Sequence, residues 1–465
     1  MSDVDAVTQA VDSQYAEWLA TLADMVRIPS VSGDPAHAVD VERSADAVAA
    51  ALDAAGLEQV RQREVDGSPP YVIGEWVHRE DAPTVLLYAH HDVQPPGVVD
   101  NWTTEPFEPR ERGGRLYGRG TADDKAGAVA HAATVAAWLR TTGELPCNVR
   151  VLVEGEEEIG SPRLEAFLTK HLDELAADVL VLADASNWKV GVPGITYSLR
   201  GIAGVDVTLR ALDGPVHSGM AGGVVPDPAL ALAKVIASLV DEHGDVAIAG
   251  FADDATRLTD DERERIEQLP DDSDALREAW GLRPGVELAG HPAVSIYERL
   301  WRRPSVAVIG LDSHPVAGSS PQIVAGATAR LNIRLAPGQD PERAHRLVRE
   351  HVAARTPWGL EVETTPVWGA PGWSTEPTGW AFDAAERALR SSFGTDPVFM
   401  GVGGSIPFAE PFAAAFGGIP ALLLGPSDPS SRIHGEDESL HLDDWRKLIV
   451  SQARLLAELA AAAPG

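Results

Sequence analysis

Short apolar runs that alternate with helical segments constrain the fold of this chain more than any other feature. The runs cover residues 70–77, 84–90, 147–155 and 177–184. Helical spacing occupies 124–140 and 161–176, and Ser161 is the expected N-cap of the second helix. Strands that alternate with helices are typical of an α/β sheet covered on both faces. We therefore expect an α/β fold with a mixed, mostly parallel sheet.

The pattern changes after about residue 195 and returns after about residue 375. Residues 194–212 and 327–337 alternate apolar and polar side chains, as half-buried antiparallel strands do. Residues 227–243 and 340–355 are amphipathic helices beside them. A chain of 465 residues is also long for one core. We expect one domain from residues 1–194 and 376–465, interrupted by an α+β domain at 195–375.

Composition limits the partners and the compartment of the protein. The formal net charge of −32 argues strongly against nucleic acid and less strongly against anionic membranes. No apolar run is long enough to span a membrane, and the first residues lack the features of a signal peptide. A single cysteine, Cys147, excludes an internal disulfide and suits a reducing cytoplasm. We expect a cytoplasmic protein with no nucleic-acid or membrane partner.

Five groups of histidine or acidic residues stand at the ends of the expected strands or before a helix, where open α/β sheets carry their sites. They are His90-His91-Asp92, Asp123-Asp124, Glu156-Glu157-Glu158, Asp184 and His434. Each group also has a simpler interpretation. A histidine can be structural, paired aspartates can cap a helix, and an acidic triplet can lie on the surface.

Taken together, the five groups indicate a metal site. Histidine and carboxylate ligands suit zinc, manganese or a related divalent ion. Two histidines and three carboxylates can hold two ions if one carboxylate bridges them. Two ions about 3.5–4 Å apart can share one hydroxide and stabilise both oxygens of a displacement.

The chain resembles the M20 metallopeptidases, in particular their carnosine-dipeptidase-like branch of zinc dipeptidases and carboxypeptidases. The resemblance spans nearly the whole chain and rests on motifs in the family's order. They are A-H-H-D-V-Q-P (89–95), G-R-G-T-A-D-D-K-A-G (118–127), E-G-E-E-E-I-G-S (154–161), Asp184, H-S-G (217–219), G-G-S-I-P (403–407) and His434. The resemblance implies that the inserted domain is a lid and dimerisation domain and that the protein is a homodimer.

The resemblance also implies roles for single residues. One metal ion is bound by His90 and Asp184, the other by Glu158 and His434, and Asp123 bridges the two. Asp92 orients His90, and Glu157 is the general base. The peptide bond between Asp123 and Asp124 is expected to be cis. The resemblance implies that the ions are zinc, with manganese or cobalt as alternatives.

Five further residues are implied to contact the substrate. His217 helps to polarise the scissile carbonyl and reaches the partner subunit's metals, Arg334 grips the substrate carboxylate, and the loop Gly403-Gly404-Ser405 holds the same group. Each could instead be an ordinary loop or strand residue. Two departures concern this side of the site: Pro321–Val324 replaces a T-x-I-P motif of many relatives, and Gly401 stands where some relatives have arginine.

We expect a metallopeptidase that hydrolyses dipeptides or short peptides with a free C-terminal carboxylate, by a hydroxide that bridges two divalent ions. An alternative is an N-acyl amino acid amidohydrolase on the same fold, in which only the acyl side differs. A second alternative is a non-catalytic binding or scaffold protein. The presence of His90, Asp123, Glu157, Glu158, Asp184 and His434 argues against the second alternative.

Overall fold

The computed structural model describes residues 2–404, 412 and 415–463. The chain forms two compact units. The first consists of residues 1–197, 376–400 and 408–465, and the second of residues 198–375 and 401–407. The expected fold class, an α/β protein with a mixed sheet and an inserted α+β part, is confirmed.

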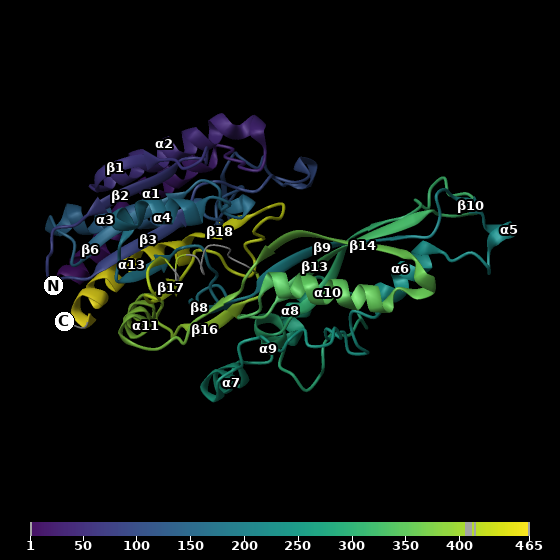
Figure 1. Cartoon of the computed structure of the whole chain (residues 1–465). Helices are drawn as coiled ribbons and strands as arrows, with labels where there is room; N and C mark the ends of the chain where they lie inside the picture. Colours follow the sequence, from purple (N-terminus) through teal and green to yellow (C-terminus); the bar gives the residue numbers. More distant parts are fainter. Residues whose placement is uncertain (1, 405–411, 413–414, 464–465) are drawn as a thin grey trace. The chain divides into compact units, whose positions relative to one another are not determined.

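The first unit is built on a mixed sheet (Figure 1). Its strands include, in order, β1 (Glu58–Arg63), β2 (Tyr71–Trp76), β6 (Asn148–Glu154), β3 (Thr84–His90), β7 (Val179–Leu182), β17 (Ala421–Leu423) and β8 (Gly194–Leu199), and β16 (Val398–Val402) also pairs with β8. The four central strands β6, β3, β7 and β17 are parallel, whereas the pairs at both edges are antiparallel. The parallel centre therefore brings the carboxyl ends of four strands to one edge of the sheet.

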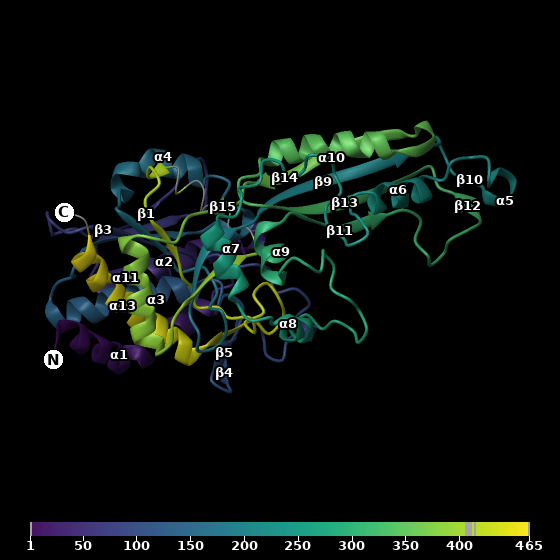
Figure 2. The ribbon, with the colours of Figure 1, turned by 90° about the horizontal axis from the view of Figure 1, so that it is seen from below.

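Helices cover both faces of this sheet (Figure 2). On one face, α3 (Lys125–Thr142) packs against α1 (Asp3–Val26), α2 (Ala38–Ala55) and α13 (Leu442–Ala462), and α13 packs against α11 (Trp380–Phe393). The small side chains of α3 allow this close approach, so the helix is buried from Lys125 to Trp138. On the other face lies α4 (Leu164–Leu175), whose Phe167 ring stacks on Tyr71 of β2 at 3.9 Å.

The expected N-cap of α4 is wrong. The helix begins at Leu164, and its cap position is Arg163, which makes no side-chain capping bond. Ser161 instead has a φ of +50°, and its N–H donates to the Glu156 carbonyl at 3.0 Å. Ser161 therefore closes the turn that follows β6.

The second unit is a four-stranded antiparallel sheet with helices on one face (Figure 1). Its order is β11 (Ser305–Asp312), β13 (Gly326–Leu335), β9 (Gly201–Arg210) and β14 (Glu361–Ala370). Helices α6 (Pro228–Ala237) and α10 (Pro341–Arg355) pack on β9. Alternate residues of β9 and β13 join the apolar core beneath these helices. The opposite face carries polar side chains such as Asp206 and Arg330, as the alternating pattern predicts.

Smaller elements complete the second unit. A two-stranded sheet pairs β10 (Val216–His217) with β12 (Gln322–Ile323), next to α5 (Ser218–Ala221). Between β10 and β11 stand three further short helices, α7 (Asp260–Glu267), α8 (Ser273–Ala279) and α9 (Ile296–Arg302). Among the described residues, no helix is both long and apolar enough to cross a membrane.

Candidate metal centre

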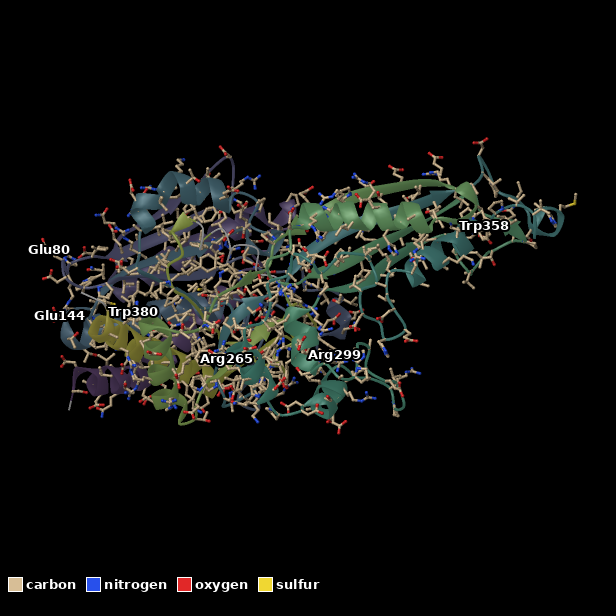
Figure 3. The ribbon with its side chains drawn as sticks, turned by 60° about the horizontal axis from the view of Figure 1, so that its bottom comes forward. Glu80, Glu144, Arg265, Arg299, Trp358 and Trp380 are labelled. Atoms are coloured by element: carbon tan, nitrogen blue, oxygen red, sulfur yellow. The ribbon has the colours of Figure 1, made fainter. Side chains whose placement is uncertain are left out.

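The candidate site lies at the carboxyl ends of the central parallel strands. His90 is the last residue of β3, Glu157 and Glu158 lie in a 3-10 turn after β6, and Asp184 follows β7. Glu80 and Glu144 stand in the loops that lead into β3 and β6, so they mark the opposite, amino ends of these strands (Figure 3). The strand pairing thus gathers residues that are up to 94 positions apart in sequence.

Asp123 lies between the two histidines of the site. Its Oδ1 is 3.0 Å from His90 Nε2, and its Oδ2 is 3.0 Å from His434 Nε2. One carboxylate therefore offers one oxygen to each side, which is the arrangement that a bridging ligand requires. His434 reaches this position from a loop with a φ of +61°, and its side chain is 55% exposed, whereas His90 is fully buried.

Glu158 belongs to the His434 side of the site. Its Oε2 is 3.2 Å from His434 Nε2. Gln94 holds the same residue with three bonds, because its backbone N–H donates to Glu158 Oε1 and its side-chain amide donates to both Oε2 and the carbonyl oxygen. The sequence alone indicates no role for Gln94 beyond its place in the motif 89–95.

Asp92 connects the His90 side with the turn that carries the two glutamates. His90 Nδ1 faces the carbonyl oxygen of Asp92 at 3.1 Å and its carboxylate at 3.4 Å. The same carboxylate accepts the backbone N–H groups of Glu157 at 3.2 Å and Glu158 at 3.0 Å. Because Nδ1 faces two acceptors, it carries the imidazole proton and leaves Nε2 free to bind a cation.

Glu157 and Asp184 lie on the His90 side of the site. A carboxylate oxygen of each lies 4.0 Å from His90 Nε2. Ligand atoms of His90, Asp123 and Glu158 lie within 4.8 Å of one another, and so do those of a second set, His90, Asp124 and Asp184. The expected ligands therefore converge on one region of the first unit.

Asp124 belongs to the second set of ligand atoms, although the resemblance does not name it as a ligand. Its carboxylate already accepts the N–H of His90 at 3.3 Å and the N–H of Gly127 at 3.2 Å. A Cβ on Gly127 would lie 2.3 Å from that carboxylate, so only glycine leaves room for it. Asp124 therefore acts as the N-cap of α3 and a support for His90. The Asp123–Asp124 peptide bond is cis, as expected.

The acidic triplet divides into a structural residue and two site residues. The Glu156 carboxylate accepts the Tyr71 hydroxyl at 2.8 Å and pairs with the Arg163 guanidinium at 2.9 Å. Glu157 and Glu158 turn toward His90 and His434 instead. A buried strand that leads into the triplet indicates its importance, but only the turn geometry decides which glutamate faces the site.

The buried ion pair of Arg119 and Glu438 supports the site, although no local sequence pattern indicates a role for either residue. Glu438 accepts a bond from Arg119 at 2.6 Å and from the backbone N–H groups of Gly120, Ala122 and Asp123 at 2.9–3.2 Å. Arg119 also donates to the Gly435 carbonyl, next to His434. The pair therefore fixes the backbone on both sides of the Asp123–His434 contact.

The donor set suits two divalent cations. Among the described residues, no lysine or arginine forms an ion pair with Asp123, Glu157, Glu158 or Asp184. Burial raises the pKa of Glu157 and of Asp184 well above the usual range, and the neighbouring carboxylates add to both shifts. Hydrogen bonds to Asp123 and Glu158 raise the pKa of His434 to about 10. Bound cations would replace these protons and keep the carboxylates ionised.

The residues expected to contact the substrate lie in the second unit. Arg334 is a half-buried residue of β13, next to Ser305 of the edge strand β11. Gly403 and Gly404 follow strand β16 (Val398–Val402), whereas Ser405 lies outside the described residues. His217 is exposed and caps the short helix α5.

Both departures from the family's motifs also lie in the second unit. A Cβ on Gly401 would lie 2.6 Å from the indole of Trp301, so this tryptophan occupies the space that a larger residue would need. The second departure is the segment Pro321–Val324. Its residues Gln322 and Ile323 form β12, which pairs with β10, the strand that carries His217.

An α/β sheet that gathers two histidines and several carboxylates at the ends of its parallel strands defines a metal-dependent hydrolase. The chain belongs to peptidase family M20/M25/M40, whose model matches residues 86–458. The expected family and enzyme class, a metallopeptidase, are thereby confirmed, and neither alternative function is favoured.

Relatives and solved structures agree over nearly the full chain. The cysteinylglycine-S-conjugate dipeptidase of Corynebacterium striatum is 33% identical over 437 residues, which are 94% of each chain. The β-Ala-His dipeptidase of Homo sapiens is 28% identical over 88% of this chain and 83% of its own. The structure of the dipeptidase Dug1p from Saccharomyces cerevisiae superposes with a TM-score of 0.85 at 26% identity, and covers 100% of both chains.

Substitution of Glu438 tests its support of the site. In the wild-type protein, the Glu438 carboxylate accepts the backbone N–H groups of Gly120, Ala122 and Asp123. In Glu438→Gln, an amide NH₂ group replaces one of the two oxygens, so a donor would face another donor. We expect the affinity for divalent metal to fall about 10–100-fold, as for other residues that support metal ligands. Chelator competition would measure it. Glu436→Gln is the control, since the Glu436 carboxylate accepts a long 3.4 Å bond from Asn101 and bonds from the backbone of Val98 and of Glu436 itself, away from the Gly120–Asp123 backbone. Equal affinities in the two variants would contradict the role of Glu438.

Proposed function

We propose that this protein hydrolyses dipeptides and short peptides that end in a free carboxylate, with two divalent metal ions in the first unit. His90 and Asp184 would hold one ion, Glu158 and His434 the other, and Asp123 would bridge them. The distances from Asp123 to the two histidines, 3.0 Å on each side, carry this proposal. Imidazole and carboxylate donors suit zinc, and manganese or cobalt would also fit.

When bound, two divalent ions would provide a Lewis acid for the scissile carbonyl and would lower the pKa of a bound water to about 7. The chain supplies the proton transfer. Glu157 is the general base in this proposal, because its carboxylate lies beside the ligands and receives no hydrogen bond from the described residues. It takes the proton of the attacking water and delivers it to the nitrogen of the leaving amine. Asp92 keeps this residue in place through the Glu157 N–H.

Neighbouring glutamates provide the test of this assignment. Glu157→Gln should keep two metal ions per chain and lose about 10²–10⁴-fold in kcat, which is the usual contribution of a general acid–base group. Glu158→Gln should bind less metal, because Glu158 faces His434 at 3.2 Å. Metal analysis and steady-state kinetics of both variants separate the two roles. Wild-type turnover in Glu157→Gln, or zero metal in the wild-type protein with excess zinc or manganese, would refute the proposal.

Arg334 and the Gly403–Gly404 loop support recognition of a free C-terminal carboxylate. Guanidinium groups bind carboxylates with paired bonds, and backbone N–H groups in a turn attract anions. The names of the relatives add candidate substrates, since one is a cysteinylglycine-S-conjugate dipeptidase and others are Cys-Gly metallodipeptidases. We therefore propose Cys-Gly and its S-conjugates as the first dipeptides to test.

The carboxylate requirement gives a direct prediction on substrates. A dipeptide should be hydrolysed, and its C-terminal amide should be a poorer substrate by at least about 10-fold in kcat/KM, since a hydrogen bond to a charged group contributes about 1.5–3 kcal/mol. A matched panel of dipeptides, their amides and N-acyl amino acids would measure it. Equal rates on acid and amide would contradict the prediction, and a preference for N-acyl amino acids would favour the deacylase alternative.

The edge of the second unit supports a homodimer. Strand β11 lies at the edge of its sheet, and Val308, Ile309 and Leu311 are 42%, 54% and 67% exposed. A cavity of about 380 Å³ lies between this strand and α6. Exposed apolar edge strands readily pair with another chain. We propose that two second units pair here and that His217, an exposed residue, acts on the partner subunit's metals.

A mixed dimer tests the action of His217 across subunits. A heterodimer of a His217→Ala chain and a Glu157→Gln chain would contain one site with both defects and one with neither. If His217 acts across subunits, the purified heterodimer should show about half of the wild-type activity, although each homodimer is nearly inactive. If subunits are shown to exchange and activity does not return, His217 acts within its own chain or has no role. A monomeric protein would refute the dimer itself.

We also propose a cytoplasmic location. Cys147 is buried and unpaired, and it is the only cysteine of the sequence, so the fold needs no oxidising compartment. The net charge of −32 supports small-molecule substrates over nucleic acid.

A further inference from the structure

Arg200 is a buried arginine of the second unit, and its guanidinium donates to neutral groups of the described residues. It follows β8 and is 8% exposed. Its guanidinium donates to the Gly403 carbonyl at 3.1 Å, to the Arg303 carbonyl at 3.3 Å and to Ser305 Oγ at 3.2 Å. Among the described residues, no carboxylate pairs with it. A buried charge without a counter-charge is costly, so its retention calls for an explanation.

A second guanidinium lies close to Arg200. Arg334 stands opposite Ser305 in the register of β13 and β11, and Ser305 is also a hydrogen-bond partner of Arg200. Burial, together with the charge of Arg334, lowers the pKa of Arg200 to about 10. Two guanidinium groups that are close enough for one to shift the pKa of the other create a region of positive potential that favours an anion.

The contact with Gly403 sets the direction of a backbone donor. In a trans peptide group, the carbonyl oxygen and the following N–H point in opposite directions. Because the Gly403 carbonyl points at Arg200, the N–H of Gly404 points away from Arg200. The guanidinium charge also polarises this peptide group, which strengthens the Gly404 N–H as a donor. A further bond, from the Arg200 N–H to the Val402 carbonyl at 3.3 Å, fixes the backbone just before this loop.

Gly403 is fitted closely against Arg200. A Cβ at this position would lie 2.9 Å from Arg200 Nη2 and 3.1 Å from the Leu300 carbonyl. Gly403 does not have a positive φ, so the requirement for glycine is one of space rather than of backbone conformation. The Arg200 guanidinium therefore occupies the space that a side chain at position 403 would need.

We propose that Arg200 is a positioning residue for substrate recognition: it holds the Gly403–Gly404 peptide so that the Gly404 N–H binds the carboxylate that Arg334 contacts. This inference rests on the proposed carboxylate specificity and names the residue that prepares the loop for it. Arg200 acts through the loop, and Arg334 acts directly. Loss of Arg200 should therefore weaken recognition of the acid without a change in the metal centre.

The experiment compares Arg200→Met and Arg200→Lys with Arg330→Met as a control. Arg330 is an arginine of the same sheet, and it is exposed and paired with Asp206 at 2.7 Å. Each variant is assayed on a dipeptide and on its C-terminal amide.

We expect Arg200→Met to raise KM for the acid about 10–100-fold, with a smaller change in kcat, and to reduce the acid-to-amide ratio of kcat/KM. Arg200→Lys keeps the charge but not the forked donors, so its effect should be intermediate. Arg330→Met should match the wild type.

Three controls make the outcome decisive. Metal content and melting temperature of Arg200→Met establish that the variant is folded. If it is not folded, Gly403→Ala takes its place, because the added methyl group displaces Arg200 Nη2 from the loop and should give the same loss of selectivity. In an Arg334→Met background, Arg200→Met should cause little further loss of selectivity, because both residues serve one carboxylate.

The two proposals fail in different ways. A wild-type protein that does not distinguish acid from amide refutes the proposed carboxylate specificity. A wild-type protein that does distinguish them, together with a folded Arg200→Met variant of unchanged KM and selectivity, refutes the positioning role alone. In that case the hydrogen bonds of Arg200 to the Arg303 carbonyl and to Ser305 only stabilise the fold of the second unit.

Discussion

Repulsion among carboxylates is the constraint on which the first unit depends. Asp123, Glu157, Glu158 and Asp184 converge within a few ångströms of His90 or His434, and the described part of the chain gives them no lysine or arginine. Such a cluster is stable only if cations or protons neutralise it. The surrounding structure accordingly holds these residues through backbone N–H groups and through the neutral side chain of Gln94, so no lysine or arginine of the described residues competes with a cation for their carboxylates.

The supporting residues form a layer behind the expected ligands. Asp92 holds His90 and the Glu157–Glu158 turn, Gln94 holds Glu158, and the Arg119–Glu438 pair holds the Asp123 loop. Each contact joins two segments that carry different ligands, so a change in one support alters the geometry of more than one ligand. This explains why short motifs extend beyond the metal ligands on both sides.

Much of the site could be predicted from the sequence, because its residues stand at the ends of apolar runs. His90 ends the mostly apolar strand β3, Asp184 stands just after the apolar strand β7, and parallel pairing brings strand ends together. Glu438, Gln94 and Arg200 could not be predicted in this way. Their roles depend on contacts with residues 64 to 319 positions away, which no local pattern records. Ser161 shows the same limit within one turn, since its backbone bond to Glu156 overrides its tendency to cap a helix.

The insertion of one unit into the other has a consequence for synthesis of the protein. Strand β17 pairs with β7, and helix α13 packs on α3. Both elements come after the whole of the second unit in the chain. His434 and Glu438 stand in the same late segment. On the ribosome, the uninterrupted stretch 198–375 is synthesised before α13. Until α13 is made, the apolar surface of α3 that packs on it stays uncovered. To pair β17 with β7, the first unit must then close a loop from residue 182 to residue 421, so the proposed metal site, which includes His434, can form only near the end of translation.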